Sequence, residues 1–588
     1  MPIDAVRQEE QIRMAEALFF SGEKLPSFAR ALFFGVCDSH RVFPFPQVDP
    51  SERARVEEVV TKLRSFCDEH LDPDWIDRHA TIPKEVIQGL GRLGVLGCTI
   101  PTEYDGLGLT QYGYCRLVEE LASRCGSTAL FVNAHQSIGL KALLLYGTPQ
   151  QKDRFLRPLA RGEMLAAFAL TEPNAGSDAA GIETTAEFDP DHRVYHINGA
   201  KQWITNGGIA GMLTVMAKVQ MEGQQRITAF IVTPDMPGFK VVDPALEKVG
   251  MRGTQTAKLA FEDLEVPPEN ILGEPGQGLK IALTCLDFGR TTFGAACTGT
   301  ARQLYRLAVD HAVHRRQFQR PLASFGLVKE MIARMGALLY AMESGTYLTA
   351  GLLDRGEEDF MLETAMLKVF ASEALWQIVY DAMQILGGRS LFCDRPYERI
   401  MRDTRLNMIG EGSNEVLRAF IGAGGIRDVG MQLKEVVEAT RHPLARLGKI
   451  LGFGRTSIHR IVTSPTIPVR SEQLQKEAGQ LASRIRRLGL AVPRLLARHK
   501  EEIIERQMIL DRLADAGMSM YMTAAVLSRL DTDLEKDPRH TTQIGEEIAL
   551  GKLYCTLAFQ NMDRAMDGFF DNDDDQVEQV SDRITGWK

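Results

Sequence analysis

The sequence predicts an α+β protein in which helical regions flank a middle β-domain. Before residue 165 and after residue 275, apolar side chains recur at a spacing of three or four, as at Val56, Val60 and Leu63. Between these regions lie short β-branched or alternating segments, which Gly, Pro and Asp turns separate. The 588 residues are also too many for one hydrophobic core. We therefore expect several domains with different secondary structure.

The changes of pattern divide the chain into five parts. These are an N-terminal extension (1–50), an N-terminal helical domain (51–165), a middle antiparallel β-domain (166–274), a C-terminal helical bundle (275–425) and an extra C-terminal helical domain (426–588). Four strands are expected in the β-domain, because their residues are β-branched or alternate between apolar and polar. Their ranges are 195–199, 212–219, 227–233 and 257–261.

A basic segment near residues 441–462 opens the extra domain. It contains five Lys or Arg residues and no Asp or Glu, with apolar side chains interleaved. Such a segment is typical of an amphipathic element that lies on an anionic membrane. A linker that docks on the protein explains the pattern equally well, so both interpretations stay open.

Charge and composition exclude several classes of protein. The net charge of -9 argues against nucleic acid as a partner. The nine cysteines are scattered without a Cys-x-x-Cys, so we expect no disulfide framework and no metal site. No apolar run reaches the ~18 residues that a membrane span needs, and the first residues do not resemble a signal or transit peptide. We expect a cytoplasmic protein or a mature organelle protein, peripheral on the inner face of the membrane if the basic segment binds lipid.

The strongest functional signal is residues 408–418, Met-Ile-Gly-Glu-Gly-Ser-Asn-Glu-Val-Leu-Arg. Glu411 lies between two glycines, which let the backbone approach a ligand closely and leave the carboxylate uncrowded. Alone, a Gly-Glu-Gly is more often a surface loop. Three further motifs precede it, and they change that balance. They are Leu-Thr-Glu-Pro-Asn-Ala-Gly-Ser-Asp (170–178), Lys-Gln-Trp-Ile-Thr-Asn-Gly (201–207) and Gln-Ile-Leu-Gly-Gly (384–388).

Together and in this order, the motifs resemble the acyl-CoA dehydrogenase family over about residues 50–425. The resemblance implies FAD as cofactor and Glu411 as the base that removes the α-proton of an acyl-CoA. It also implies a trans-2-enoyl-CoA product and an electron-transfer flavoprotein as electron acceptor. The chemistry is consistent, because the α C–H of a thioester is a weak acid that needs a carboxylate positioned in a dry pocket.

The resemblance also assigns ligand contacts, residue by residue. Contacts to FAD in the same subunit are expected from Phe168, Leu170, Thr171, Gly176, Ser177, Trp203, Ile204 and Thr205. Arg315, Phe318, Gln384, Gly387 and Gly388 match positions that reach the FAD of a neighbouring subunit, which implies a homodimer. Ser413 completes the FAD set, and Ser177, Arg290 and Gly412 are expected at the acyl-CoA.

Several positions refine the resemblance. Gly289 stands where some relatives carry their base, which leaves Glu411 as the candidate. Gly410 replaces a common aromatic beside the base, and residues 390–391 depart from the family pattern after Gly-Gly. These changes are expected to affect substrate shape or flavin affinity, and they remove no group that the mechanism requires.

The Val-Phe-Pro-Phe-Pro stretch at 42–46, residues 134–141 and the C-terminal extension resemble the very-long-chain subgroup, in which the C-terminal region associates with a membrane. Gly139 either leaves the end of an acyl pocket open or permits close helix packing, and the sequence supports both. We expect His135 to be structural.

Two other functions remain as alternatives. An acyl-CoA oxidase would let oxygen reach the reduced flavin, and sequence does not reveal oxygen access. A non-catalytic assembly or scaffold protein could use the same fold, but the presence of Glu411 favours an enzyme.

Overall fold

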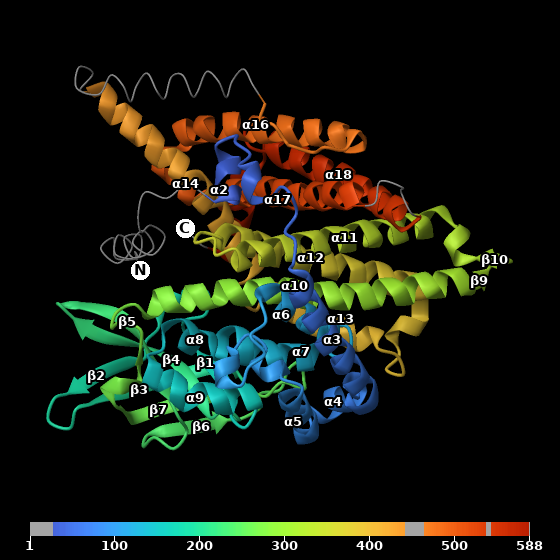
Figure 1. The fold of residues 1–588 in the computed structure, drawn as a ribbon. Coiled ribbons are helices and arrows are strands. Elements are labelled where there is room, and N and C mark those ends of the chain that lie inside the picture. The colour runs from blue at the N-terminus through green and yellow to red at the C-terminus, as the bar shows by residue number, and fades with distance from the viewer. Residues whose placement is uncertain (1–26, 442–463, 537–541, 587–588) are drawn as a thin grey trace. The chain divides into compact units, whose positions relative to one another are not determined.

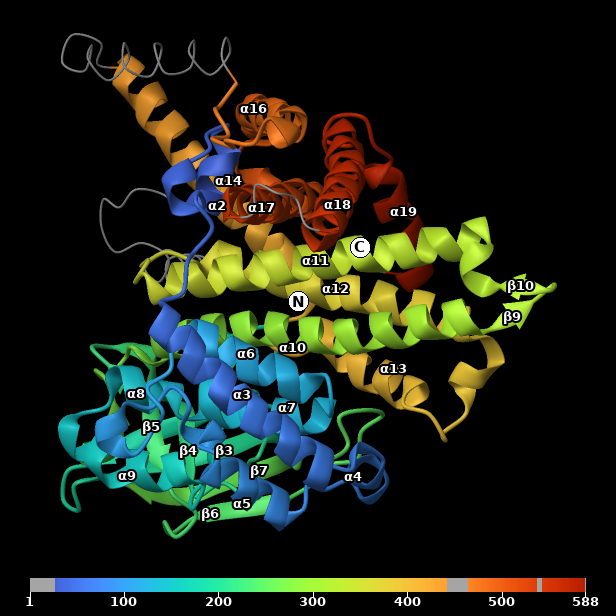
Figure 2. The ribbon, with the colours of Figure 1, turned by 45° about the vertical axis from the view of Figure 1, so that its right-hand side comes forward.

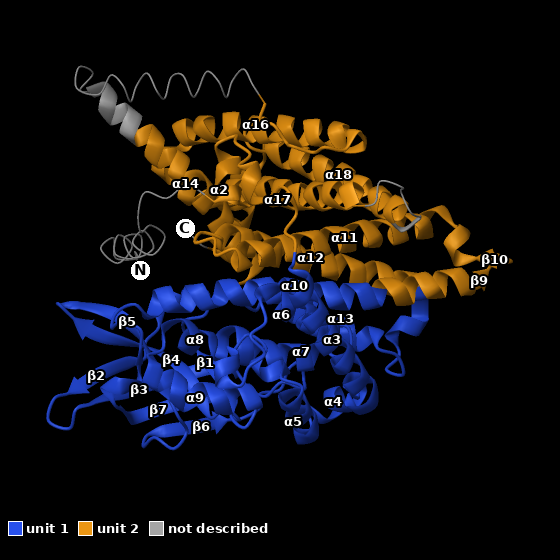
Figure 3. Cartoon of the chain, in the orientation of Figure 1, with its two compact units in different colours: residues 1–25, 48–304, 386–411 blue, residues 26–47, 305–385, 412–588 orange. Residues whose placement is uncertain are grey.

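The computed structural model describes residues 27–441, 464–536 and 542–586. These residues form two compact units (Figure 3). Unit 1 comprises residues 48–304 and 386–411, and unit 2 comprises the described residues of 26–47, 305–385 and 412–588. The predicted basic segment falls almost entirely outside the described residues.

Unit 1 begins with helices that pack beside a sheet (Figure 1). The helices are α3 (Pro50–His70), α4 (Pro73–His79), α5 (Lys84–Arg92), α6 (Gln111–Ala122), α7 (Gly126–Asn133), α8 (Lys141–Tyr146), α9 (Pro149–Arg161), the first part of α10 (Gly278–His314) and α13 (Tyr397–Arg405). Asp49, Asp72 and Thr148 precede the prolines that open α3, α4 and α9, and their side-chain oxygens accept hydrogen bonds from the first backbone N–H groups. The predicted N-terminal helices are therefore fixed by local capping chemistry.

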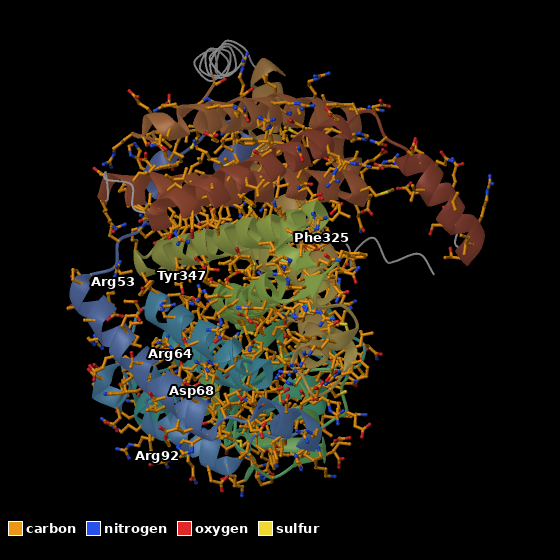
Figure 4. The ribbon with its side chains drawn as sticks, turned by 90° about the vertical axis from the view of Figure 1, so that its right-hand side faces the viewer. Arg53, Arg64, Asp68, Arg92, Phe325 and Tyr347 are labelled. Carbon is orange, nitrogen blue, oxygen red and sulfur yellow. The ribbon has the colours of Figure 1, made fainter. Side chains whose placement is uncertain are left out.

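Helix α3 buries one face and exposes a charged one. Val56, Val60 and Leu63 lie in an apolar cluster with residues of α6 and α7. On the outer face, Arg64 and Asp68 stand one turn apart (Figure 4). Arg64 pairs with Glu120 at 2.9 Å and Asp68 pairs with Arg124. Exposed ion pairs of this kind add little stability, so the apolar face holds the helix in place.

The sheet of unit 1 contains the four predicted strands and four more. The strands are β1 (Ala166–Ala169), β2 (Thr185–Asp189), β3 (Val194–Thr205), β4 (Met212–Met221), β5 (Gln224–Val232), β6 (Phe239–Asp243), β7 (Thr256–Val266) and β8 (Ile271–Leu272). Their order is β6-β7-β3-β2-β4-β5-β8, with β1 paired to β4. Most neighbours are antiparallel, as predicted, but β1 and β2 run parallel to β4, so the sheet is mixed.

Strand β4 shows why the sequence did not reveal this arrangement. Met212 and Met216 join an apolar cluster with α8 and α9, and Leu213 and Val215 join the cluster on the opposite face. Because both faces are buried, residues 212–217 are apolar except for Thr214, and their pattern does not indicate which strands lie beside β4.

Unit 2 is helical, apart from one short hairpin (Figure 2). The helices are α2 (Phe28–Phe33), the last part of α10, α11 (Gly326–Asp354), α12 (Met361–Leu386), α14 (Asn414–Arg441), α16 (Gln475–His499), α17 (Gln507–Lys536), α18 (Thr542–Asp567) and α19 (Asp574–Thr585), and the hairpin pairs β9 (Arg316–Gln317) with β10 (Arg320–Pro321). The limit predicted at residue 425 falls within α14, which runs on to Arg441. None of the described helices combines the length and the apolar character that crossing a bilayer requires.

The N-terminal extension contributes α2 to the core of unit 2. Phe28, Leu32 and Phe33 lie in one apolar cluster with residues of α14, α16 and α17. Arg30 donates to Asp359 at 2.8 Å and to the carbonyl of Gly424 at 3.2 Å. The extension is therefore part of a packed core, which the sequence did not indicate.

Glu363 of α12 holds the start of α2. Its carboxylate accepts a 2.8 Å hydrogen bond from the backbone N–H of Ala29. Burial, with a smaller contribution from Asp359, raises the pKa of Glu363 from 4.5 to about 7. The folded protein therefore binds a proton here that the unfolded chain releases above pH 4.5.

Glu363→Gln is expected to stabilise the protein at pH 8 and to have little effect near pH 4. The raised pKa means that the stabilising neutral form is lost as the pH rises towards about 7. The difference in free energy of unfolding between Glu363→Gln and the wild type should grow to the order of 3 kcal/mol above that pH. Denaturant unfolding of both proteins between pH 4 and 8 measures it. The exposed Glu58→Gln serves as control, and equal pH profiles for wild type and Glu363→Gln would contradict the buried-carboxyl interpretation.

Candidate active site

Glu411 lies in a strained turn between the 3-10 turn Leu406–Met408 and helix α14. Its φ is +61°, and that of Gly412 is +95°. A non-glycine residue rarely adopts this left-handed conformation, which costs on the order of 1 kcal/mol and concentrates at functional sites. The two glycines of the motif therefore flank a residue that is itself held in an unusual backbone geometry.

The carboxylate of Glu411 lies against helix α10. A Cβ placed on Gly289 would come within 3.1 Å of Glu411 Oε2 and within 3.3 Å of the side chain of Ile138. Any side chain at 289 would therefore crowd the carboxylate. Gly410 leaves room on its own side, because a Cβ there would meet nothing closer than 3.7 Å.

Arg290 supports this turn through the backbone. Its Nε donates to the carbonyl oxygen of Glu411 at 3.3 Å, and its Nη1 donates to Asp287 at 2.8 Å. The guanidinium and the Asp287 carboxylate are both buried. This geometry makes Arg290 a positioning group for Glu411, and its predicted contact with substrate stays a prediction.

A buried ion pair joins the two predicted flavin motifs of unit 1. Lys201 Nζ donates to Glu172 at 2.6 Å and to the carbonyl of Leu170 at 3.0 Å. The two side chains are 0% and 2% exposed. Gln202 N–H donates to the carbonyl of Thr171 at 2.9 Å. The turn after β1 is thus fixed to β3 next to Trp203.

Trp203 is the residue that best fits a planar cofactor. It lies within a register shift of β3, between Lys201 and Ile204; its φ is +60°, and its side chain is 58% exposed. A large aromatic residue that is both strained and exposed is unusual in a strand and suits a ligand that covers it. Gly176 adds an open backbone, since a Cβ there would meet no atom within 4 Å. The residues present therefore fit a flavin ring and its polar substituents.

The remaining predicted flavin contacts of unit 1 differ in accessibility. Phe168, Leu170 and Ile204 are buried in the apolar clusters of the sheet, so only their backbone atoms could reach a ligand. Ser177 is exposed and Thr205 is partly exposed. These motifs therefore contain both accessible groups and core residues.

The residues predicted to reach a neighbouring subunit lie on exposed segments. Phe318 is 87% exposed in the β9–β10 turn with a φ of +50°, and Arg315 is exposed where α10 ends. Gln384 is exposed near the end of α12, and both Gly387 and Gly388 have open space around them. Ser413 starts the first turn of α14, where its carbonyl accepts from Leu417 N–H. Arg315, Phe318, Gln384, Gly412 and Ser413 belong to unit 2, and the other predicted site residues belong to unit 1.

Comparison with known proteins identifies the family. Models of the N-terminal, middle and C-terminal domains of acyl-CoA dehydrogenases match residues 54–163, 167–264 and 276–426, and the ACAD9/ACADV C-terminal domain matches residues 472–586. The mitochondrial very long-chain specific acyl-CoA dehydrogenase of Homo sapiens is 37% identical over 521 residues, which cover 87% of this chain and 79% of the relative. The chain belongs to the acyl-CoA dehydrogenase family.

Further relatives agree with this assignment. A probable acyl-CoA dehydrogenase of Mycobacterium tuberculosis is 33% identical over 604 residues, covering 98% of this chain and 91% of the relative. An acyl-CoA dehydrogenase from Bacillus anthracis, solved in complex with FAD, superposes with a TM-score of 0.79 at 28% identity and covers 93% of this chain and 94% of its own. Butyryl-CoA dehydrogenase from Megasphaera elsdenii gives a TM-score of 0.61 at 34% identity and covers 64% of this chain and 98% of its own.

This acyl-CoA dehydrogenase is therefore an FAD-dependent oxidoreductase that acts on acyl-CoA. The predicted fold class is confirmed, including the C-terminal helical extension that resembles the very-long-chain subgroup.

His135 is part of the scaffold of this acyl-CoA dehydrogenase. It is fully buried in the π-helix Ala134–Gly139, where its Nδ1 accepts from Ala166 N–H and its Nε2 lies 3.0 Å from the carbonyl of Leu96. Burial lowers its pKa to about 4, so the ring is neutral. Its two hydrogen bonds join the helical region to strand β1, in agreement with a structural role.

Gly139 permits close packing of the same π-helix. A Cβ there would lie 2.7 Å from the carbonyl oxygen of Ala134 and 2.9 Å from Ala166 Cβ. The sequence left two roles open for Gly139. The geometry favours close packing of the π-helix against β1 over an open end of the acyl pocket.

Gly139→Ala is expected to destabilise this acyl-CoA dehydrogenase by about 1–3 kcal/mol, because the added methyl group overpacks the contact with β1. Thermal unfolding measures the change. Gly479→Ala is a matched helical control, since a Cβ at Gly479 meets nothing within 4 Å. An unchanged stability, combined with loss of activity towards long acyl chains alone, would instead support the open pocket.

Sequence reasoning missed several supporting residues. Glu172 and Lys201 lie within recognised motifs, but their pairing depends on how β1 and β3 meet. Lys368 is a single lysine in an apolar part of α12, and its side chain is fully buried. A lone cation in an apolar helix was the available signal, because a buried ammonium group needs acceptors.

Proposed function

We propose that this acyl-CoA dehydrogenase converts long-chain acyl-CoA to trans-2-enoyl-CoA with Glu411 as the catalytic base. The observation that supports this most directly is the position of the Glu411 carboxylate against Gly289, to which the side chain of Ile138 also lies close, in a turn that Arg290 supports. A carboxylate in partly apolar surroundings is well suited to remove an α-proton from a thioester.

The chain's own groups account for substrate activation. Glu411 takes the α-proton, and its backbone N–H is the proposed donor to the thioester carbonyl oxygen, where negative charge develops. When bound, FAD supplies the acceptor for the hydride from the β-carbon. The fixed turn provides the geometry on which such proton abstraction depends, since small displacements strongly reduce the rate.

The proposed FAD contacts are those of the sequence motifs. In unit 1, the exposed ring of Trp203 covers one face of the flavin, and Thr171, Gly176 and Ser177 offer polar groups. Thr205 adds a hydroxyl next to Trp203. Arg315 and Phe318 are assigned to the FAD of a neighbouring subunit in a homodimer, as are the exposed Gln384, Gly387 and Gly388.

Substrate length, the electron acceptor and location are part of the same proposal. The C-terminal extension and the similarity to very long-chain specific enzymes favour long acyl chains. The space beside Gly410 is consistent with an acyl group that needs more room near the base. We assign an electron-transfer flavoprotein as the electron acceptor, and peripheral membrane contact to the basic segment near residues 441–462.

Anaerobic titration of the purified protein with acyl-CoAs from butyryl to stearoyl tests the proposal. We expect the long chains to bleach the visible absorbance of the flavin and butyryl-CoA to do so weakly. Absence of bleaching with every chain length, in protein that carries FAD, would contradict it. Rapid reoxidation in air, without an electron-transfer protein, would indicate an oxidase.

A further inference from the structure

Lys368 of α12 fixes the turn that follows Glu411. Its Nζ donates to the carbonyl oxygen of Gly412 at 2.7 Å and to Asn414 Oδ1 at 2.9 Å. The side chain is 0% exposed, so its charge depends on such acceptors. The carbonyl of Gly412, the residue that follows Glu411, is therefore anchored by a buried cation.

Asn414 connects the Lys368 contact to the carboxylate of Glu373. It is the first residue of α14, and its Nδ2 donates to Ser372 Oγ at 3.0 Å and to Glu373 Oε1 at 3.1 Å. Both partners lie on α12, one turn from Lys368. Both the oxygen and the nitrogen of the Asn414 side-chain amide are therefore hydrogen-bonded to α12.

Arg418 extends the network to α17. Its Nε and Nη2 donate to Glu373 at 3.2 and 2.7 Å, and its Nη1 donates to Asp511 at 2.8 Å and to Asp515 at 2.6 Å. The Arg418 side chain is only 16% exposed. Asp511 and Asp515 are like charges one turn apart, an arrangement that destabilises a helix unless a cation stands opposite.

Helix α17 belongs to the extension, not to the catalytic domains. The extension is matched by the ACAD9/ACADV C-terminal domain at residues 472–586, whereas Glu373 and Arg418 lie within the catalytic C-terminal domain at 276–426. The butyryl-CoA dehydrogenase described above aligns with only 64% of this chain. Three charged groups therefore join the extension to the helix that begins next to Glu411.

We propose that the extension positions the catalytic turn through Arg418, with Asp511 and Asp515 as positioning residues. The carboxylates of α17 hold Arg418, which orients Glu373, and Glu373 orients Asn414 beside the anchored Gly412 carbonyl. This role rests on the proposed assignment of Glu411 as base. It gives the extension an indirect part in proton abstraction, through the position of the turn that carries Glu411.

The double variant Asp511→Ala/Asp515→Ala tests this role in the full-length holoenzyme. Both positions lie in the body of α17, where alanine supports the helix. We expect faster amide hydrogen exchange across residues 409–416 and flavin reduction by acyl-CoA slowed by about tenfold or more. FAD content and acyl-CoA affinity should be unchanged. Asp511→Glu/Asp515→Glu keeps the charges and should restore most of the rate.

Asp574→Ala provides the matched control. Asp574, the first residue of α19, forms a bidentate ion pair with Arg512 of α17 at 2.6 and 2.7 Å, and this pair does not involve Arg418. The control should lower stability without changing exchange at 409–416 or the rate of reduction. If Asp574→Ala and the double variant change hydrogen exchange at 409–416 and the rate of flavin reduction equally, the network only contributes to general stability, and the proposal is overturned.

The outcomes also separate this proposal from the assignment of the base. If the double variant leaves exchange and rate unchanged while Glu411→Gln is inactive, Glu411 is the base and the positioning role fails. If Glu411→Gln stays active while the double variant accelerates exchange, the network holds the turn and the base lies elsewhere. Lys368→Gln, which acts at the other end of the network, should reproduce the effect of the double variant on exchange.

Discussion

Glu411→Gln is expected to keep FAD bound and to abolish its reduction by acyl-CoA. Glutamine has nearly the same shape, so the contacts with Gly289 and the backbone bond from Arg290 can persist. It cannot take a proton, and loss of a general base reduces rates by roughly 10²–10⁴-fold. Anaerobic stopped-flow measurement of flavin reduction gives the rate directly.

Two measurements make this prediction specific. FAD content and acyl-CoA binding should match those of the wild type, which shows that the site is intact. Glu415→Gln changes an exposed carboxylate on the first turn of α14 and should leave the rate unaltered. A Glu411→Gln variant that is reduced at the wild-type rate would exclude this residue as the base.

Glu172→Gln is expected to destabilise unit 1 by about 3–5 kcal/mol, because it leaves the Lys201 ammonium buried without its counter-charge. Both side chains are almost completely inaccessible, at 0% and 2% exposure. The pair also joins the turn after β1 to the strand that bears Trp203, so FAD retention should fall as well. Denaturant unfolding and flavin content per protein measure the two effects.

The pH dependence of this effect follows from the pKa of Glu172. Burial alone would raise that pKa, but Lys201 and the hydrogen bonds from Thr184 and Glu183 lower it below 4.5. The stabilisation is therefore present above pH 4.5 and is lost as the pH falls through the lower folded value. The difference between wild type and Glu172→Gln should shrink in the same range.

An exposed pair on the same sheet serves as control. Lys240 and Glu262 form an ion pair with 55% and 63% exposure. Glu262→Gln should change stability by less than about 1 kcal/mol, since solvent screens such pairs. Similar losses of stability in Glu262→Gln and Glu172→Gln would show that burial does not determine how much each ion pair contributes.

Much of the architecture could be predicted because local patterns determine it. The spacing of Val56, Val60 and Leu63 predicts a helix with one buried face, and that face lies in the core. The strands around Met212 and Ile227 follow from β-branched segments between turns. The parallel pairing of β1 and β2 with β4 could not be predicted, because β4 is buried on both faces and its pattern carries no information about neighbours.

The candidate site was predictable for a different reason. Glu411 and Trp203 stand in motifs that are specific as a set, although each is weak alone. Their left-handed backbone conformations, at φ values of +61° and +60°, could not be predicted, because neither residue type favours that region.

The sequence by itself determined the family, the order of helical and β regions, and the residues to consider for catalysis and cofactor binding. Periodicity and motifs encode these properties within short stretches of chain. Only the tertiary structure decided that Lys201 pairs with Glu172, that Gly139 packs against β1, and that the extension reaches the turn beside Glu411 through Arg418. Each of these depends on segments distant in sequence meeting in space, where burial converts ordinary charged or small residues into groups that fix a geometry.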